Sequence, residues 1–196
     1  MIRRPPTSTL FPYTTLFRST NGESTRYISH DKQTGDIVII CEFLPIGLFS
    51  REEGTTEVRI NYENRLVYNK LKDDFLNYYR ILSELRELSA LMNVHNIFEE
   101  NNTVYVVEEN EDLIPFEEYV ERSNGHLEWD IARPLFMPVI SALEALHKRG
   151  VGHYAIAPKN MYITASGKIK ISGSRSEEHT SELQSHHDLG CRLLLE

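Results

Sequence analysis

The chain has 196 residues, of which 29 are acidic and 21 are Lys or Arg, so its formal net charge at pH 7 is −8. This acidic balance, without a basic stripe, argues against nucleic acid or an anionic membrane surface as a partner. No run of apolar residues approaches the roughly 18 that a membrane-spanning helix needs, so we expect no membrane span within this chain.

Both ends of the chain differ in character from the rest and resemble translated sequencing adapters. They read MIRRPPTSTLFPYTTLFRS, residues 1–19, and RSEEHTSELQSHHDLGCRLLLE, residues 175–196. The common adapter start AGATCGGAAGAGC reads in one frame as Arg-Ser-Glu-Glu, the first four letters of the second segment. We expect residues 1–19 to be a disordered artefact and residues 175–196 to be an artefact as well. The alternative for the first segment is a genuine leader rich in Pro and Thr.

Residue types that bind metals gather in the second end segment. They would suit a Cys/His metal site, but they all lie in residues 175–196 and are set aside: His179, His186, His187 and Cys191. Cys41 is then the only cysteine of residues 20–174. One cysteine cannot form an internal disulfide, which predicts a reducing, cytoplasmic setting. Membrane tethering by another part of a longer parent chain stays open.

The first half of the remaining sequence predicts a β-hairpin followed by one long helix. The runs TRYISHD and IVIICEFL are rich in β-branched and aromatic residues and flank the turn KQTGD, which predicts two strands. EVRIN and RLVYN predict short strands or a loop. In residues 69–92, apolar residues recur at steps of three, four and seven, which predicts a helix. They are Leu71, Phe75, Tyr78, Leu82, Leu85 and Met92.

The second half predicts a further hairpin, two helices and a final pair of strands. HNIFEENNTVYVVEEN predicts a hairpin that turns at EENN. The acidic EENEDL, residues 108–113, predicts a solvated hinge, with a cation site as the alternative. IPFEEYVER predicts a short helix. Residues 130–150 predict a longer helix, capped by Asp130, kinked at Pro138 and stopped at Gly150. NMYITASGKIKIS predicts two strands around ASG. This order is typical of an α+β fold with two lobes.

These segments together resemble a bacterial Ser/Thr protein kinase domain. VIICEFLP resembles its third-strand motif, the long helix stands in the place of helix C, and TVYVVEE resembles the strand entering the hinge. LHKRGVGHYAIAPKNMYITASGKIKISG resembles, without a gap, helix E, the H-R-D-x-x-x-x-N loop and the strand entering D-F-G. The resemblance implies a small lobe over residues 20–110. It implies the start of the large lobe, with helices D and E and the catalytic loop, over residues 111–174.

The charged positions of kinase chemistry hold uncharged residues in this sequence. By the resemblance, Cys41 stands at the lysine that binds the ATP phosphates, Ala155 at the catalytic aspartate, and Gly173 at the metal-binding aspartate. No glycine-rich loop is visible before Thr20. Loss of a general base alone lowers a rate by about 10² to 10⁴.

Other residues of the kinase pattern are retained. His153 matches the loop histidine, and Glu84 is the expected helix C glutamate. The resemblance implies that Glu109, Cys41 and Asn160 border bound ATP and that Asn160 is a weak Mg²⁺ ligand. Each also has a structural reading: Cys41 as a small buried hydrophobe, His153 as a brace of its loop, and Asn160 as a turn residue.

Three interpretations of function stay open. The first is a pseudokinase that binds nucleotide, or a protein or peptide partner, without transferring phosphate. The second is a divergent active Ser/Thr kinase that transfers the ATP γ-phosphate to protein with substitute residues such as Lys159. A third is a truncated reading frame with no function of its own.

The boundary after Ser174 can be tested on DNA. The kinase-like register reaches the D-F-G position where the adapter-like letters begin. We therefore expect the parent gene to continue from Ser174 into an activation segment. Amplifying and sequencing the locus from source DNA measures this, and a genome that encodes residues 175–196 would contradict the trimming.

Overall fold

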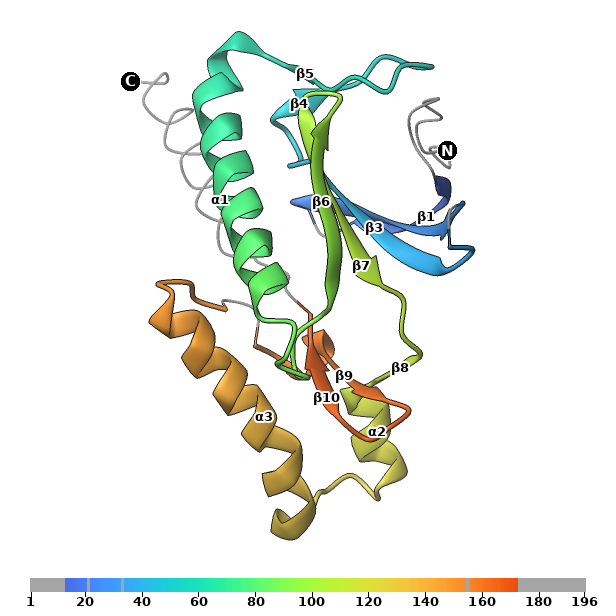
Figure 1. Cartoon of the computed structure of the whole chain (residues 1–196), viewed down its shortest axis with the longest axis vertical. Coiled ribbons are helices and arrows are strands. Elements are labelled where there is room, and N and C mark those ends of the chain that lie inside the picture. The colour runs from blue at the N-terminus through green and yellow to red at the C-terminus, as the bar shows by residue number, and fades with distance from the viewer. Residues whose placement is uncertain (1–12, 21, 33, 154–155, 173–196) are drawn as a thin grey trace, which may run out of the picture.

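The computed structural model describes residues 13–20, 22–32, 34–153 and 156–172. Two sheets lie toward opposite ends of its long axis, as Figure 1 shows. Helix α1 (Arg65–Glu84) runs beside the larger sheet, and α2 (Phe116–Arg122) and α3 (Trp129–Lys148) accompany the smaller one. None of the described helices is both long enough and apolar enough to cross a bilayer.

The larger sheet has five antiparallel strands in the order β1-β2-β3-β7-β6. Their bounds are β1 Tyr13–Thr20, β2 Ser24–Asp31, β3 Ile37–Phe43, β6 Val94–Glu100 and β7 Thr103–Glu109. Both predicted hairpins, β2–β3 and β6–β7, are confirmed. The second turns at Asn101 and Asn102, whose φ angles of 53° and 63° suit asparagine better than most residues. A short ribbon pairs β4 (Phe49–Ser50) with β5 (Arg59–Ile60).

Strand β1 lies in a segment for which the sequence analysis predicted disorder. It pairs antiparallel with β2, with Tyr13 opposite Asp31 and Thr20 opposite Thr25. The letters YTTLFRST are rich in β-branched and aromatic residues, which favour a strand whatever the origin of the segment. The prediction of disorder is therefore wrong for residues 13–19, and residues 1–12 lie outside the described part of the chain.

Helix α1 begins and ends earlier than its apolar period predicted. It covers Arg65–Glu84 in place of residues 69–92, and RLVYN forms its first turns. After Glu84 the chain leaves the helix through successive turns, in which the amide of Leu88 donates to Leu85 and the amide of Leu91 to Leu88, both at 3.0 Å. Leu85 and Met92 lie after the helix but are still buried in the core. Their apolar character therefore reflects burial and does not indicate a longer helix.

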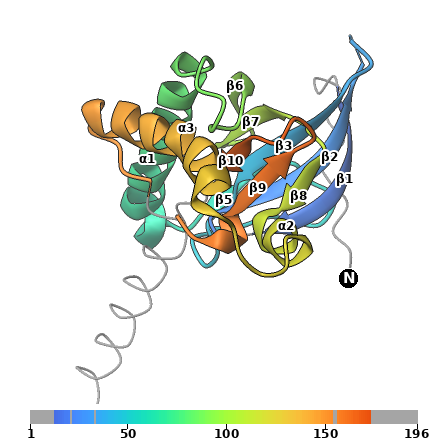
Figure 2. The same ribbon diagram turned by 90° about the horizontal axis from the view of Figure 1, so that it is seen from below.

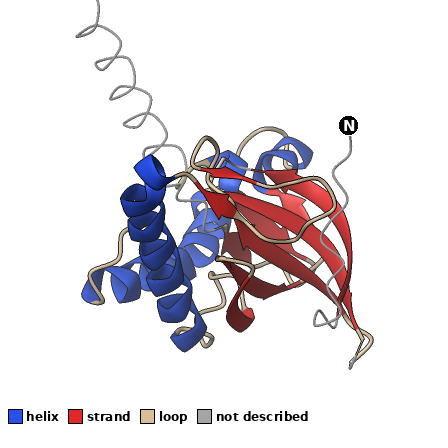
Figure 3. Cartoon of the chain, turned by 90° about the horizontal axis from the view of Figure 1, so that it is seen from above, coloured by secondary structure: helices blue, strands red, loops and turns tan. Residues whose placement is uncertain are grey.

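Aromatic rings join α1 to the inner face of the larger sheet. Phe43 of β3 lies with its ring centroid 5.1 Å from Phe75, and Phe75 lies 4.7 Å from Tyr79. Viewed from above, the long helices lie to one side of the strands (Figure 3). The alternation of side chains along β3 therefore sends Cys41 and Phe43 into the main core.

The outer face of this sheet carries a buried carboxylate, Glu42, which is 0% exposed. It accepts hydrogen bonds from the hydroxyls of Tyr27 at 2.8 Å and Tyr105 at 2.7 Å, and it forms an ion pair with Arg51. Hydroxyl and guanidinium donors together replace the water that a buried carboxylate loses. Val38, Ile40 and Val107 pack on the same face.

The smaller sheet has the order β10-β9-β8, from β8 (Leu113–Pro115), β9 (Met161–Thr164) and β10 (Ile169–Ile171). The last two are the strands predicted around ASG. Helix α3 ends at Lys148, and Gly150, with a φ of 71°, stands just after its C-terminus as predicted. The predicted cap at Asp130 is wrong: Glu128 precedes the helix in extended conformation, and Asp130 lies in the first turn, where a negative charge suits the helix dipole.

Backbone contacts connect the two sheets. The amide of Ile171 donates to the carbonyl of Ala90 at 2.8 Å, and Leu91 forms a parallel bridge with Ile171. The view from below shows α2 and α3 beside the three strands of the smaller sheet (Figure 2).

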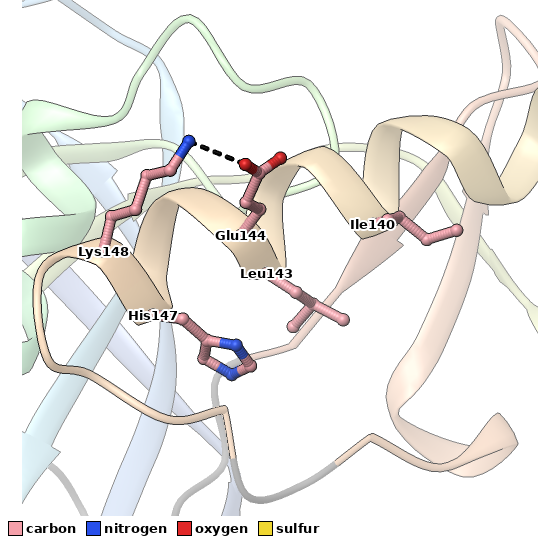
Figure 4. A pocket seen from close by; sticks show the side chains of 5 residues that line it. All are labelled: Ile140, Leu143, Glu144, His147 and Lys148. Carbon is pink, nitrogen blue, oxygen red and sulfur yellow. Dashed lines mark ion pairs between the residues drawn. The ribbon is translucent and has the colours of Figure 1, made fainter.

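One face of α3 is apolar and exposed. Ile140 is 55% exposed and Met137 is 49% exposed. Ile140 and Leu143 line an open pocket together with His147 and the Glu144–Lys148 ion pair, whose atoms lie 2.6 Å apart (Figure 4). An apolar surface of this kind binds hydrophobic dyes and favours association.

This face generates a prediction about dye binding. In the double variant Met137→Lys and Ile140→Lys we expect weaker fluorescence of an anilinonaphthalene sulfonate dye and a melting temperature within a few degrees of wild type, because both side chains are about half exposed. Val139→Lys is the matched control. Val139 is 3% exposed, so its replacement should unfold the chain. Equal destabilisation by both changes would contradict the assignment of the exposed face.

Candidate functional site

Cys41 lies at the centre of the candidate site, on β3 between Arg26 of β2 and Val106 of β7. Its side chain is 0% exposed and contacts Tyr79 of α1. Burial raises the pKa of the Cys41 thiol to about 12, although the nearby Arg26 guanidinium opposes the shift. The thiol therefore stays protonated near neutral pH and offers no charge to a phosphate group.

Arg26 is the cation nearest this thiol among the groups that shift its pKa. Antiparallel pairing places Arg26 directly opposite Cys41, and its side chain is 19% exposed. One guanidinium nitrogen, Nη2, forms an ion pair with Oε2 of Glu108. The other, Nη1, donates to the Ser172 hydroxyl at 3.3 Å. Arg26 thus joins the larger sheet to the segment that follows β10.

Glu108 is a carboxylate inside the core, with a side chain that is 2% exposed. Besides Arg26, the Cys41 sulfur lies 3.8 Å from Oε2 of Glu108 as a weak donor. The prediction that Glu108 lies in a solvated hinge is wrong, because the residue is buried. Side chains alternate along β7, so Glu108 shares the inward face with Val104 and Val106, and this period was the signal available in the sequence.

Glu109, predicted to border ATP, ends β7 and is partly exposed. The Asn93 side-chain amide donates to it at 2.5 Å, and this hydrogen bond, helped by Lys170, lowers the pKa of Glu109. Lys170 of β10 forms an ion pair with Glu111, and its own side chain is 7% exposed. The hinge segment is therefore tied to the smaller sheet by charge.

Glu84 does not lie beside Cys41. It is the last residue of α1, it is 65% exposed, and its carboxylate lies 3.7 Å from Nε of Arg149 at the end of α3. The prediction of a helix C glutamate facing the third strand is therefore wrong at this residue. Tyr79, five residues earlier and about 140° around the helix, faces Cys41 instead.

Of the loop residues that the resemblance named, His153 and Asn160 are described, whereas Ala155 and Gly173 lie outside the described residues. His153 is 8% exposed, and burial lowers its pKa, which keeps the ring neutral at pH 7. Asn160 ends the 3-10 helix η2 (Pro158–Asn160), and its carbonyl accepts from the Ser172 amide at 2.9 Å.

The chemistry available around Cys41 follows from these contacts. The thiol is neutral, and the cation opposite it is paired with a buried carboxylate. Within the described ranges, no group of three or more His, Cys, Asp or Glu side chains is arranged to hold a metal ion. Asn160 alone could contribute one oxygen to Mg²⁺, a hard cation that prefers carboxylates and phosphate oxygens.

A family model described as "Protein kinase domain" matches residues 59–181. This range contains α1, the hinge and the loop around His153, and it extends past the boundary drawn after Ser174. Among solved structures, the apo form of PpkA-294 superimposes with a TM-score of 0.75 at 17% sequence identity, covering 95% of this chain and 67% of that one. The two-lobed α+β fold predicted from the sequence is confirmed.

Two relatives illustrate the likeness in sequence. The chain is 24% identical over 147 residues to 3-phosphoinositide-dependent protein kinase 1 of Arabidopsis thaliana, which covers 74% of this chain and 30% of that protein. It is 32% identical over 122 residues to a probable serine/threonine-protein kinase of Clostridium perfringens (strain 13 / Type A), which covers 56% and 17%. The matched parts are thus less than a third of either relative.

The burial of Cys41 generates a prediction about its reactivity. In a Cys191→Ser background, where Cys41 is the only cysteine, we expect iodoacetamide at pH 8 to label the folded chain on the order of 10³-fold more slowly than the denatured chain. The reason is that the thiolate is the nucleophile and burial suppresses it. Mass spectrometry over time measures the rate, and rapid stoichiometric labelling of the folded chain would contradict the assignment.

The same raised pKa predicts how stability depends on pH. Between about pH 9 and 12 the unfolded thiol ionises while the folded thiol keeps its proton, so the free energy of unfolding should decrease as pH rises. Cys41→Ala is the control, since it should remove this component of the pH dependence.

Proposed function

The chain belongs to the protein kinase domain family, and from this membership we propose that it is a pseudokinase, a kinase-fold module that acts by binding and transfers no phosphate. One observation carries the proposal. At the position of the phosphate-binding lysine stands Cys41, a buried thiol whose pKa is raised to about 12. A neutral group there cannot offset the charge of the transferred phosphates.

Two further positions support the proposal from the sequence. Ala155 stands where kinases hold the catalytic aspartate, and Gly173 where they hold a metal-binding aspartate. Phosphoryl transfer depends on positioning and charge neutralisation, so these losses act on the same step. Groups that act as a unit are strongly non-additive, which means that restoring one of them should restore little.

A module of this kind would act through its surfaces. We propose a protein or peptide partner and an origin in a bacterial Ser/Thr kinase-like protein, because the third-strand motif VIICEFLP resembles that group. ATP and Mg²⁺ are the ligands that the family suggests, with Glu109 and Asn160 as bordering residues. The net charge of −8 favours a partner with basic groups.

A divergent active Ser/Thr kinase is the second candidate. Its relatives include proteins named as serine/threonine kinases, and a cation, Arg26, lies directly opposite Cys41. In this alternative Arg26 or Lys159 would take over the role of the missing lysine. It requires Arg26 to leave Glu108, its present partner.

The two candidates differ in an assay of phosphate transfer. We expect no transfer of radiolabelled γ-phosphate to a generic protein substrate or to the chain itself, with Mg²⁺ or Mn²⁺, for wild type and for Cys41→Lys. The single restoration should stay inactive because Ala155 and Gly173 remain uncharged. The triple variant Cys41→Lys, Ala155→Asp and Gly173→Asp serves as comparison. Robust transfer by the wild type would reject the pseudokinase and favour the active kinase.

A further inference from the structure

We infer that Arg26, Glu108 and Ser172 form an internal bridge that fills the place of a nucleotide, so that the chain closes its own cleft and binds no ATP. We call these three residues the Arg26 bridge. The inference rests on the proposed function, because a chain that transfers phosphate must bind ATP. It goes further in naming side chains that exclude the ligand and hold the two lobes together without it.

The Arg26 bridge lies next to the positions that surround a nucleotide in kinases. A kinase nucleotide lies between the phosphate-binding lysine, the hinge and the metal-binding aspartate. By the sequence match, the first two places are Cys41 and Glu109, and the third falls at Gly173, which lies outside the described residues. Arg26 lies opposite Cys41, its ion-pair partner Glu108 immediately precedes Glu109, and Ser172 immediately precedes Gly173. Among the described residues, the bridge therefore lies beside the lysine position and the hinge and ends on the residue that precedes Gly173 in sequence.

The negative charge of Glu108 opposes the binding of a phosphate group. The Glu108 carboxylate is 2% exposed, and its charged partner is Arg26. An ATP phosphate approaching Cys41 would meet this carboxylate, and like charges in a water-poor site repel strongly. If Arg26 turned to bind the phosphate, Glu108 would remain buried without its cation, which is a severe penalty. The single positive charge of Arg26 cannot neutralise both the Glu108 carboxylate and the phosphate.

Ser172 is held in a fixed position by backbone hydrogen bonds. Its amide donates to the Asn160 carbonyl at 2.9 Å, and the preceding residue, Ile171, donates to Ala90 at 2.8 Å. Backbone hydrogen bonds at Ser172 itself and at the preceding Ile171 therefore fix the residue whose hydroxyl accepts from Nη1 of Arg26. Lys170 and Glu111 form a second ion pair between the smaller sheet and the hinge. These contacts hold the two lobes together, a role that a bound nucleotide would otherwise have.

The experiment compares nucleotide binding by the full chain and by chains without the bridge. Isothermal titration and thermal shift are measured with ATP, with ATP plus Mg²⁺, and with adenosine. We expect no saturable binding by the wild type up to millimolar concentrations. The double variant Arg26→Val and Glu108→Met replaces both charges by apolar groups and leaves neither unpaired. It should gain binding of ATP and of adenosine, with a rise in melting temperature of about 5–10 °C at saturation.

A second variant covers the case in which the double variant does not fold. Glu108→Gln keeps the shape of the side chain, removes its charge and releases Arg26, so it should gain binding of ATP but not of adenosine. The matched control is Arg122→Val with Glu118→Met, which removes an exposed ion pair of α2 and should gain no binding. Failure of every folded bridge variant to bind would overturn the inference, because the bridge would then not be the obstacle.

The wild type separates this inference from the proposed function. Saturable binding of ATP or adenosine without phosphate transfer overturns the inference and leaves the pseudokinase standing. Loss of ATP binding with adenosine binding kept, in Arg26→Val with Glu108→Met, would then identify Arg26 as a phosphate ligand. Transfer of γ-phosphate rejects the proposed function itself, and it is measured in a separate assay.

Discussion

A carboxylate that is buried inside a sheet needs a cation or several donors, and Glu108 meets this need through Arg26. The arrangement of the site depends on this pair. Because Arg26 is committed to Glu108, it lies over Cys41 and reaches Ser172, which joins two parts of the chain that are 146 residues apart. Removing one partner of such a buried pair costs about 3–5 kcal/mol, so each charge makes the other obligatory.

The larger sheet satisfies a second buried carboxylate on its opposite face. Glu42 has two tyrosine hydroxyls and Arg51 as donors, all from the same lobe, and it therefore stabilises that lobe alone. Arg26, the partner of Glu108, also donates a hydrogen bond to Ser172, which follows β10. Two acidic residues with similar burial thus have different consequences: Glu42 ties the outer face of the larger sheet to the loop that carries Arg51, and Glu108, through Arg26, connects the larger sheet to Ser172.

Much of the fold was predictable from the sequence, because strands and helices follow local periods. The alternating runs around residues 24–43 and 94–109 became hairpins, and the stop of α3 at Gly150 followed from its backbone preference. The site was less predictable, because it depends on which helical residue faces the sheet. Glu84 matches the helix C glutamate of kinases in sequence, yet it is the last residue of α1, and its side chain is exposed beside Arg149. The pair of Arg26 and Glu108 spans 82 residues and follows only from strand order, which a single sequence does not reveal.

Strand β1 has a consequence for how this domain can be trimmed. It supplies the outer neighbour of β2 through backbone pairing from Tyr13 to Thr20. A chain that starts at Thr20 would leave one side of β2 without hydrogen-bond partners, and an open strand of this kind adds further strands from other molecules. The adapter-like segment that forms β1 thus covers the edge of β2. Removing it would leave this edge open to pairing with other molecules, unless another strand of the parent protein takes its place.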